Sequence, residues 1–88
     1  MAEISDAHFR AVVASVFGVE PSRILDTLRP GDLPSWDSLG HLSLISALEQ
    51  AFAIGFTMEE SLSINSVADV KAVLHKHGIH LSNSRAAS

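Results

Sequence analysis

The chain contains no cysteine among its 88 residues. This absence excludes disulfide bonds, thiolate metal sites and a cysteine nucleophile. A domain of this size has room for one modest hydrophobic core, so its stability must come from packing alone. With 47% hydrophobic residues, the composition is that of a folded domain and not of a disordered segment.

The chain is also short of basic residues. Ten acidic residues stand against six basic residues, and the formal net charge is −4. Nucleic-acid-binding domains usually present a basic face, so we expect no nucleic-acid partner. The acidic balance instead suits a protein that meets basic partners.

Long apolar stretches are missing as well. No run approaches the ~18 consecutive apolar residues that suggest a membrane span. Residues 1–6 have neither the basic head nor the apolar core of a secretory signal. We therefore expect a cytoplasmic protein, or a fragment of an organelle or multienzyme protein, without a membrane span. We also expect it to be a monomer.

Hydrophobic periodicity predicts the first helix over residues 6–17. Ser5 or Asp6 can cap the start of this helix, and Gly18 can end it in a left-handed conformation. The apolar side chains that recur at helical spacing form one stripe: Phe9, Val12, Val13, Val16 and Phe17.

Residues 19–36 cannot continue a helix, because they contain three prolines and Gly31. A short turn can begin at Pro21. A connection of this length is unusual in a small domain, and such loops often serve function. Four apolar side chains are expected to anchor the loop to the core: Ile24, Leu25, Leu28 and Leu33.

A second helix is predicted over residues 38–52, with Asp37 as its N-cap. Leu39 falls on the polar side of its helical wheel, and Leu42 lies at the flank of that side. Because both leucines are close to Ser38, they predict a small exposed apolar spot, which is typical of a docking surface. The opposite side of the wheel predicts the buried face: Leu44, Ile45, Leu48, Ala51 and Phe52.

Two further helices are predicted after this one. Thr57 and Glu60 fit a capping box for a short helix over residues 58–62. Ser66 can cap a last helix over residues 67–77, and Gly78 can close it. The side chains expected in the core from this region are Ile54, Phe56, Leu62, Val67, Val70, Val73 and Leu74.

These elements predict an all-α fold, a small four-helix bundle of three main helices and one short helix. The long loop lies between the first and second helices. We expect the domain to cover residues 1–81 and residues 82–88 to form a flexible C-terminal tail.

Ser38 is the candidate site for covalent chemistry. It follows a loop rich in proline and glycine, so its hydroxyl should be exposed. The free amides and the positive dipole end at a helix start suit a phosphate ester on that hydroxyl. The alternative is that Asp37 and Ser38 only begin the helix, since both residue types are favoured there.

The segment Asp37-Ser38-Leu39 resembles the attachment motif of acyl carrier proteins. The helix after it is similar to the second helix of that family in its apolar spacing and in its closing Leu-Glu-x-x-Phe, here Leu48 to Phe52. The order of helix, long loop, motif helix, short helix and last helix is similar too. The resemblance covers residues 4–80.

The resemblance implies that Ser38 carries a 4′-phosphopantetheine arm, transferred from coenzyme A by a separate Mg²⁺-dependent phosphopantetheinyl transferase. The thiol of the arm would hold acyl groups as thioesters, so the chain would be a carrier and not an enzyme, without catalytic residues or a metal of its own. Asp37 would cap the helix and lie near the phosphate.

The resemblance also implies the partners, which are acyl-loading and acyl-using enzymes such as acyltransferases and synthases. They would belong to lipid, fatty-acid, polyketide or related biosynthesis. The expected partner surface consists of Leu39, Leu42, Ile45, Ser46, Glu49 and Glu59.

The chain departs from the family pattern in its second helix. An acidic residue usually follows the leucine of the motif, and here Gly40 stands there. Acids that are common later in the helix appear as Ser43, Gln50 and Ala51, while Glu49 is retained. Because fatty-acid carriers use that acidic face to meet basic enzymes, we expect a specialised carrier and not the general fatty-acid carrier.

Trp36 is a further departure, because many relatives have a smaller residue there. It can pack the loop against the bundle or contact a substrate.

Two other functions are considered. A small helical docking module without a prosthetic group could use Leu39, Leu42 and Ile45. A hydrolase could use Ser38 as nucleophile, His41 as base and Asp37 to orient the base, but no Gly-x-Ser-x-Gly segment is present. We expect His41 to be a partly buried neutral histidine.

Three histidines near the end of the chain are candidates for a metal site. They have no pairing with a carboxylate or thiolate, so we predict no metal site there. They are His75, His77 and His80.

Overall fold

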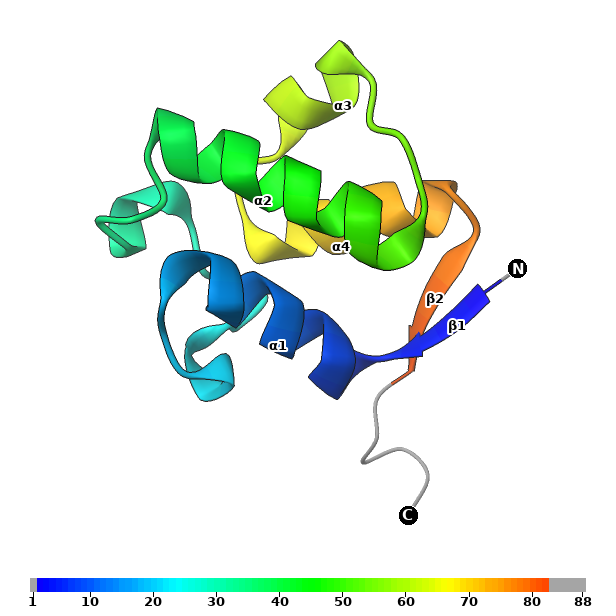
Figure 1. Cartoon of the computed structure of the whole chain (residues 1–88), viewed down its shortest axis with the longest axis horizontal. Helices are drawn as coiled ribbons and strands as arrows, with labels where there is room; N and C mark the ends of the chain where they lie inside the picture. The colour runs from blue at the N-terminus through cyan, green and yellow to red at the C-terminus, as the bar shows by residue number, and fades with distance from the viewer. Residues whose placement is uncertain (1, 83–88) are drawn as a thin grey trace.

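The computed structural model describes residues 2–82 and shows a small helical bundle (Figure 1). The three main helices are α1 (Asp6–Phe17), α2 (Ser38–Phe52) and α4 (Val67–Lys76), and the short helix is α3 (Met58–Ser63). These bounds agree with the predicted ones to within one residue. The all-α class and the long loop between α1 and α2 are therefore confirmed.

The helix ends form through the capping residues that the sequence predicts. Gly18 ends α1 in the left-handed conformation at φ +68°, and Gly78 adopts φ +83° after α4. Ala53 is also left-handed, with φ +56° at the end of α2, although alanine adopts this conformation at a cost. The four side chains that cap the starts of α1, α2, α3 and α4 are Ser5, Asp37, Thr57 and Ser66.

The core lies between α1, α2 and α4, where the predicted apolar stripes meet. Val12, Val16 and Ile45 are only partly buried at its edge. The predicted core residues that are fully packed there are Phe9, Val13, Phe17, Leu44, Leu48, Phe52, Val67, Val70, Val73 and Leu74.

Three predicted core positions are wrong. Ala51 is exposed, because it lies at the edge of the apolar sector of α2, where a small side chain gains little from burial. Leu62 is 72% exposed, because α3 has no buried residue and lies on the surface of the bundle. Leu25 is 53% exposed in the long loop. Ile54 and Phe56 are partly buried against the core.

Two short strands were not predicted. β1 (Ala2–Ser5) and β2 (Ile79–Ser82) pair in parallel, with Ala2 beside Ile79 and Ser5 beside Ser82. The predicted boundary at residue 81 is therefore one residue too early, since Ser82 belongs to the paired strand. The rest of the expected tail, residues 83–88, lies outside the described residues.

The long loop is attached to the bundle at several points. It contains two single turns of 3₁₀ helix, η1 (Pro21–Arg23) and η2 (Pro30–Asp32). The backbone carbonyls of Asp26 and Leu28 accept hydrogen bonds from the first amides of α4, those of Ala68 and Val67, both at 3.0 Å. The predicted anchors that are buried are Ile24, Leu28 and Leu33.

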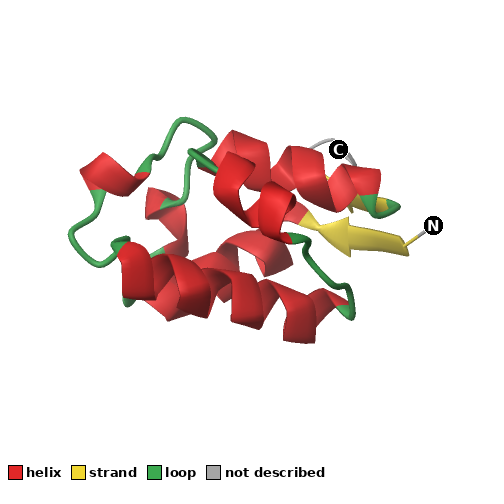
Figure 2. Cartoon of the chain, turned by 90° about the horizontal axis from the view of Figure 1, so that it is seen from above, coloured by secondary structure: helices red, strands yellow, loops and turns green. Residues whose placement is uncertain are grey.

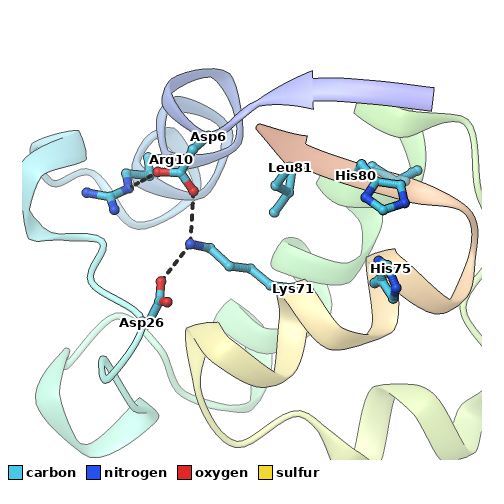
Figure 3. Close-up of a pocket in the computed structure, with 8 residues that line it drawn as sticks. Asp6, Arg10, Asp26, Lys71, His75, His80 and Leu81 are labelled. Carbon is cyan, nitrogen blue, oxygen red and sulfur yellow. Dashed lines mark hydrogen bonds and ion pairs between the residues drawn. The ribbon is translucent and has the colours of Figure 1, made fainter. Parts of the chain in front are cut away.

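An ion cluster joins the loop to two helices (Figure 3). Lys71 Nζ of α4 lies 2.9 Å from Asp6 Oδ1 of α1 and 2.6 Å from Asp26 Oδ1 of the loop, and Arg10 Nε lies 2.6 Å from Asp6 Oδ2. Partial burial opposes ionisation of Asp6, but the hydrogen bond from Lys71 and the charges of Lys71 and Arg10 outweigh it, so the pKa of Asp6 is lowered.

The two ends of the bundle differ in what they carry. The strand pair lies at one end, and the long loop, which leads into the start of α2, lies at the other (Figures 1 and 2). The start of α2 is therefore remote from both strands. Among the described residues, no helix is both long and apolar enough to cross a membrane.

Candidate functional site

Ser38 is the first residue of α2, and its side chain is exposed as predicted. Asp37 precedes it as the N-cap and accepts a hydrogen bond from the Gly40 amide, 2.8 Å from Asp37 Oδ1. Because Asp37 supplies the cap, the helix start does not need the hydroxyl of Ser38. That hydroxyl is therefore available for chemistry at the surface.

Gly40 is required by the way in which the loop crosses the first turn of α2. A Cβ atom at this position would lie 2.0 Å from the backbone oxygen of Ser35. Ser35 is held in place because its hydroxyl donates a hydrogen bond to the carbonyl of Phe17, at 3.2 Å. This close approach is a physical reason for the absence of an acidic residue after Leu39.

An open cleft of about 600 Å³ begins at Ser38 and lies between the loop, α2 and α3. Leu42, Met58 and Leu62 line it and are largely exposed, and we call these three residues the cleft rim. The deeper residues form the cleft floor, which consists of Trp36, His41 and Ile64. Trp36 and Ile64 are each only 3% exposed. A mainly apolar surface thus adjoins the candidate serine.

Trp36 and His41 form a hydrogen-bonded bridge across the cleft floor. Trp36 Nε1 donates to His41 Nδ1 at 3.1 Å, and His41 Nε2 lies 2.9 Å from the carbonyl oxygen of Ser61 in α3. Since His41 Nδ1 accepts a hydrogen bond, the proton of a neutral ring is on Nε2 and can be donated to Ser61. The predicted partial burial of His41 is confirmed, and its contacts fit the neutral ring.

The packing role considered for Trp36 is confirmed, because its ring stacks on Phe17 with ring centroids 5.2 Å apart. Trp36 also lines the cleft, so a contact with a substrate stays a prediction. The hydrolase arrangement is not formed, because both ring nitrogens of His41 bond to Trp36 and Ser61 and not to Ser38.

The predicted partner surface is only partly exposed. Leu39 and Leu42 are 75% and 64% exposed, as expected. Ser46 and Glu59 are also exposed, whereas Ile45 is partly buried against the core. Glu49 turns inward in part, since its Oε2 atom accepts a hydrogen bond from the Phe56 amide at 2.8 Å.

Met58 and Leu62 were missed as site residues. The sequence pattern placed Leu62 in the core and gave Met58 no role. In the structure Leu62 is 72% exposed and Met58 is 76% exposed. The sequence did contain a signal for this exposure, because a short helix with a capping box can form without a buried face.

Polar contacts hold α3 against the rest of the bundle. His41 bonds to the Ser61 carbonyl from α2, and His77 Nε2 lies 3.0 Å from Glu60 Oε1 at the end of α4. The hydrogen bond from the Thr57 amide, followed by that from His77, lowers the pKa of Glu60. The outer wall of the cleft is therefore attached in part by two histidines.

The three histidines considered for a metal do not share a site. His75 and His80 contact each other edge to face, with ring centroids 4.7 Å apart, while His77 bonds to Glu60. Within residues 2–82, no cluster of three metal-binding side chains has the geometry to hold an ion.

No protein-family model matches the chain, and no curated protein matches it in sequence. The function is therefore inferred from the residues of this chain and from the geometry around Ser38.

Proposed function

We propose that this protein is an acyl carrier protein in which Ser38 carries a 4′-phosphopantetheine arm. The observation that carries the proposal is the place of Ser38, which is exposed, opens α2 and adjoins the apolar cleft. The residues fit the group, because a phosphate ester is favoured at a helix start and the arm has an apolar surface next to it.

The chain contributes a position and a surface, and the prosthetic group contributes the reactive thiol. The thiol of the arm would hold an acyl group as a thioester. Asp37 keeps the start of α2 formed while Ser38 is modified, and the cleft rim offers apolar contacts to what the arm carries. The lack of cysteine is compatible with this role, because the thiol belongs to the arm.

The proposed partners are a phosphopantetheinyl transferase and acyl-loading and acyl-using enzymes of lipid, polyketide or related synthesis in the cytoplasm. We propose a specialised carrier, because α2 has few acids on the side expected to meet partner enzymes. Gly40, Ser43, Gln50 and Ala51 stand where carriers of fatty acids commonly have acidic residues. Fewer negative charges there attract a basic enzyme less strongly.

The modification is tested by intact mass after incubation with coenzyme A, Mg²⁺ and a broad-specificity phosphopantetheinyl transferase. We expect one phosphopantetheine on the wild type and none on Ser38→Ala. Ser43→Ala is the matched control, because Ser43 is an exposed serine of the same helix and should not affect the modification. No addition to the folded wild type with a panel of transferases would reject the carrier function.

The specialised role has a separate test. The modified protein should serve a general fatty-acid ketoacyl synthase at least about tenfold less efficiently in kcat/KM than that enzyme's own carrier does, because fewer carboxylates steer the encounter. Equal efficiency would reject the specialised role and leave the carrier function intact.

The second candidate function is a docking module without a prosthetic group. It is favoured by the exposure of Leu39, Leu42, Met58 and Leu62 around the start of α2 and on α3. For such a module, Ser38→Ala would leave partner binding almost unchanged, whereas it abolishes the function of a carrier.

A further inference from the structure

We propose that His41 closes the cleft toward the interior of the bundle, so that the protein carries a short acyl group that stays in the outer cleft. This inference rests on the proposed carrier function and adds the class of cargo to it. It makes His41 a residue that determines specificity through the space available to the cargo.

The bridge at the cleft floor joins three segments of the chain. Trp36 belongs to the long loop, His41 to α2 and the Ser61 carbonyl to α3, and the two hydrogen bonds are 3.1 and 2.9 Å long. A chain attached at Ser38 that passed inward between α2 and α3 would have to separate His41 from Ser61. Partly buried polar groups would then lose their partners, which opposes entry.

The core of the bundle offers no easy passage either. Trp36 stacks on Phe17, and Leu44 and Leu48 of α2 are 0% exposed. Protein cores are packed as densely as organic crystals, so an entering chain would have to displace these side chains.

The outer part of the cleft has the opposite character. The cleft rim of Leu42, Met58 and Leu62 is apolar and largely exposed, and it adjoins Ser38. A short aliphatic group can reduce the exposed apolar area there without breaking the bridge. The additional carbons of a long chain would extend into solvent and would gain no further burial.

The fluorescence of Trp36 reports on the environment of the cleft floor in solution. Trp36 is the only tryptophan, and the chain has no tyrosine, so the intrinsic fluorescence reports this position. The experiment loads Ser38 with acetyl, butanoyl, octanoyl and hexadecanoyl forms of the arm from the matching acyl-coenzyme A. We expect the Tm to stop rising after the butanoyl form and the Trp36 emission maximum to stay unchanged across the series.

His41→Ala should open the floor. We expect its Trp36 emission maximum to shift with the octanoyl and hexadecanoyl forms, and its Tm to rise with chain length. His77→Ala is the matched control, because it removes the other histidine contact to α3, that with Glu60, and leaves the cleft floor intact. It should behave like the wild type.

Three outcomes overturn the proposal. The first is a wild type whose emission and Tm change progressively up to the hexadecanoyl form. The second is a His77→Ala series equal to that of His41→Ala, which would show general loosening of α3. If intact mass shows no modification of Ser38, the carrier function falls as well, whereas the first two outcomes leave it standing. Should His41→Ala fail to fold, the wild-type series decides alone.

Discussion

At the scale of single residues, the start of α2 combines a free hydroxyl with a tightly constrained backbone. Asp37 and Ser38 were both identified from local pattern, because capping depends on neighbours in sequence. The constraint on Gly40 could not be identified in this way. It arises from the Ser35 carbonyl and from the tie between Ser35 and Phe17, which is a contact between the loop and the end of α1.

Gly40→Ala should lower the stability by about 2 kcal/mol, because the new Cβ atom would meet the Ser35 backbone oxygen. In an unconstrained helix the same change would raise the stability by about 1 kcal/mol. The measurement is urea unfolding followed by circular dichroism. Gly55→Ala is the control, since nothing lies within 4 Å of its added Cβ atom. A Gly40→Ala variant more stable than the wild type would contradict the close approach.

Ala53→Gly should raise the stability by about 0.5–1 kcal/mol, because glycine adopts the left-handed conformation at the end of α2 without the steric cost that alanine has there. Differential scanning calorimetry of the two proteins would show the rise in Tm. A lower Tm for the glycine variant would mean that the backbone at residue 53 is not left-handed in solution.

At the scale of elements, α3 is anchored mainly by polar contacts. It has no buried residue, and Glu60 connects it to His77 and Lys76 at the end of α4. Its position could not be obtained from the sequence, because the contact of His41 with Ser61 spans 20 residues and that of Glu60 with His77 spans 17. The short helix itself was predicted, since its capping box is local.

Acid should release α3 before the rest of the bundle. The Thr57 amide and His77 lower the pKa of Glu60 below 4.5, so the contribution of this carboxylate is present above pH 4.5 and is lost as the pH falls through the lowered value. Hydrogen exchange of the α3 amides, measured at descending pH, should show this release first. Glu60→Gln should remove the pH dependence, and an unchanged dependence in that variant would assign it to another group.

At the scale of the whole molecule, two connections join segments that are distant in the sequence. One is the strand pair, and the other is the cluster of Asp6, Arg10, Asp26 and Lys71, which joins α1, the loop and α4 (Figure 3). Neither could be predicted from local pattern. Four-residue strands carry little periodicity, and a parallel pair between the two ends of the chain becomes visible only when the fold is known.

Lys71→Met should cost about 1–2 kcal/mol at neutral pH, because it leaves two carboxylates without their shared partner. Lys76→Met is the control, since Lys76 is 69% exposed and lies 3.8 Å from Glu60 Oε2. It should cost less than about 0.5 kcal/mol. Equal losses in the two variants, measured by urea unfolding, would contradict a special role of the cluster.

The cluster should also shape the dependence of stability on pH. The pKa of Asp6 is lowered from 3.8, so its contribution is lost as the pH falls through the lowered value. Burial opposes the charge of Lys71, but the hydrogen bonds to Asp26 and Asp6 raise its pKa above 10.5. The contribution of Lys71 is therefore complete below pH 10.5 and is lost as the pH rises through the raised value. Lys71→Met should therefore make the free energy of unfolding less dependent on pH at both the acidic and the basic end.

The position of the strand pair also determines from which side the domain can be attached to a support. β1 and β2 include both ends of the described chain, and they lie at the end of the bundle opposite the start of α2 (Figure 1). A support or a fusion attached at residue 2 or residue 82 would therefore approach from the end opposite Ser38. An immobilised sample would keep Ser38 turned toward the bulk solution, where the proposed partner enzymes could reach it.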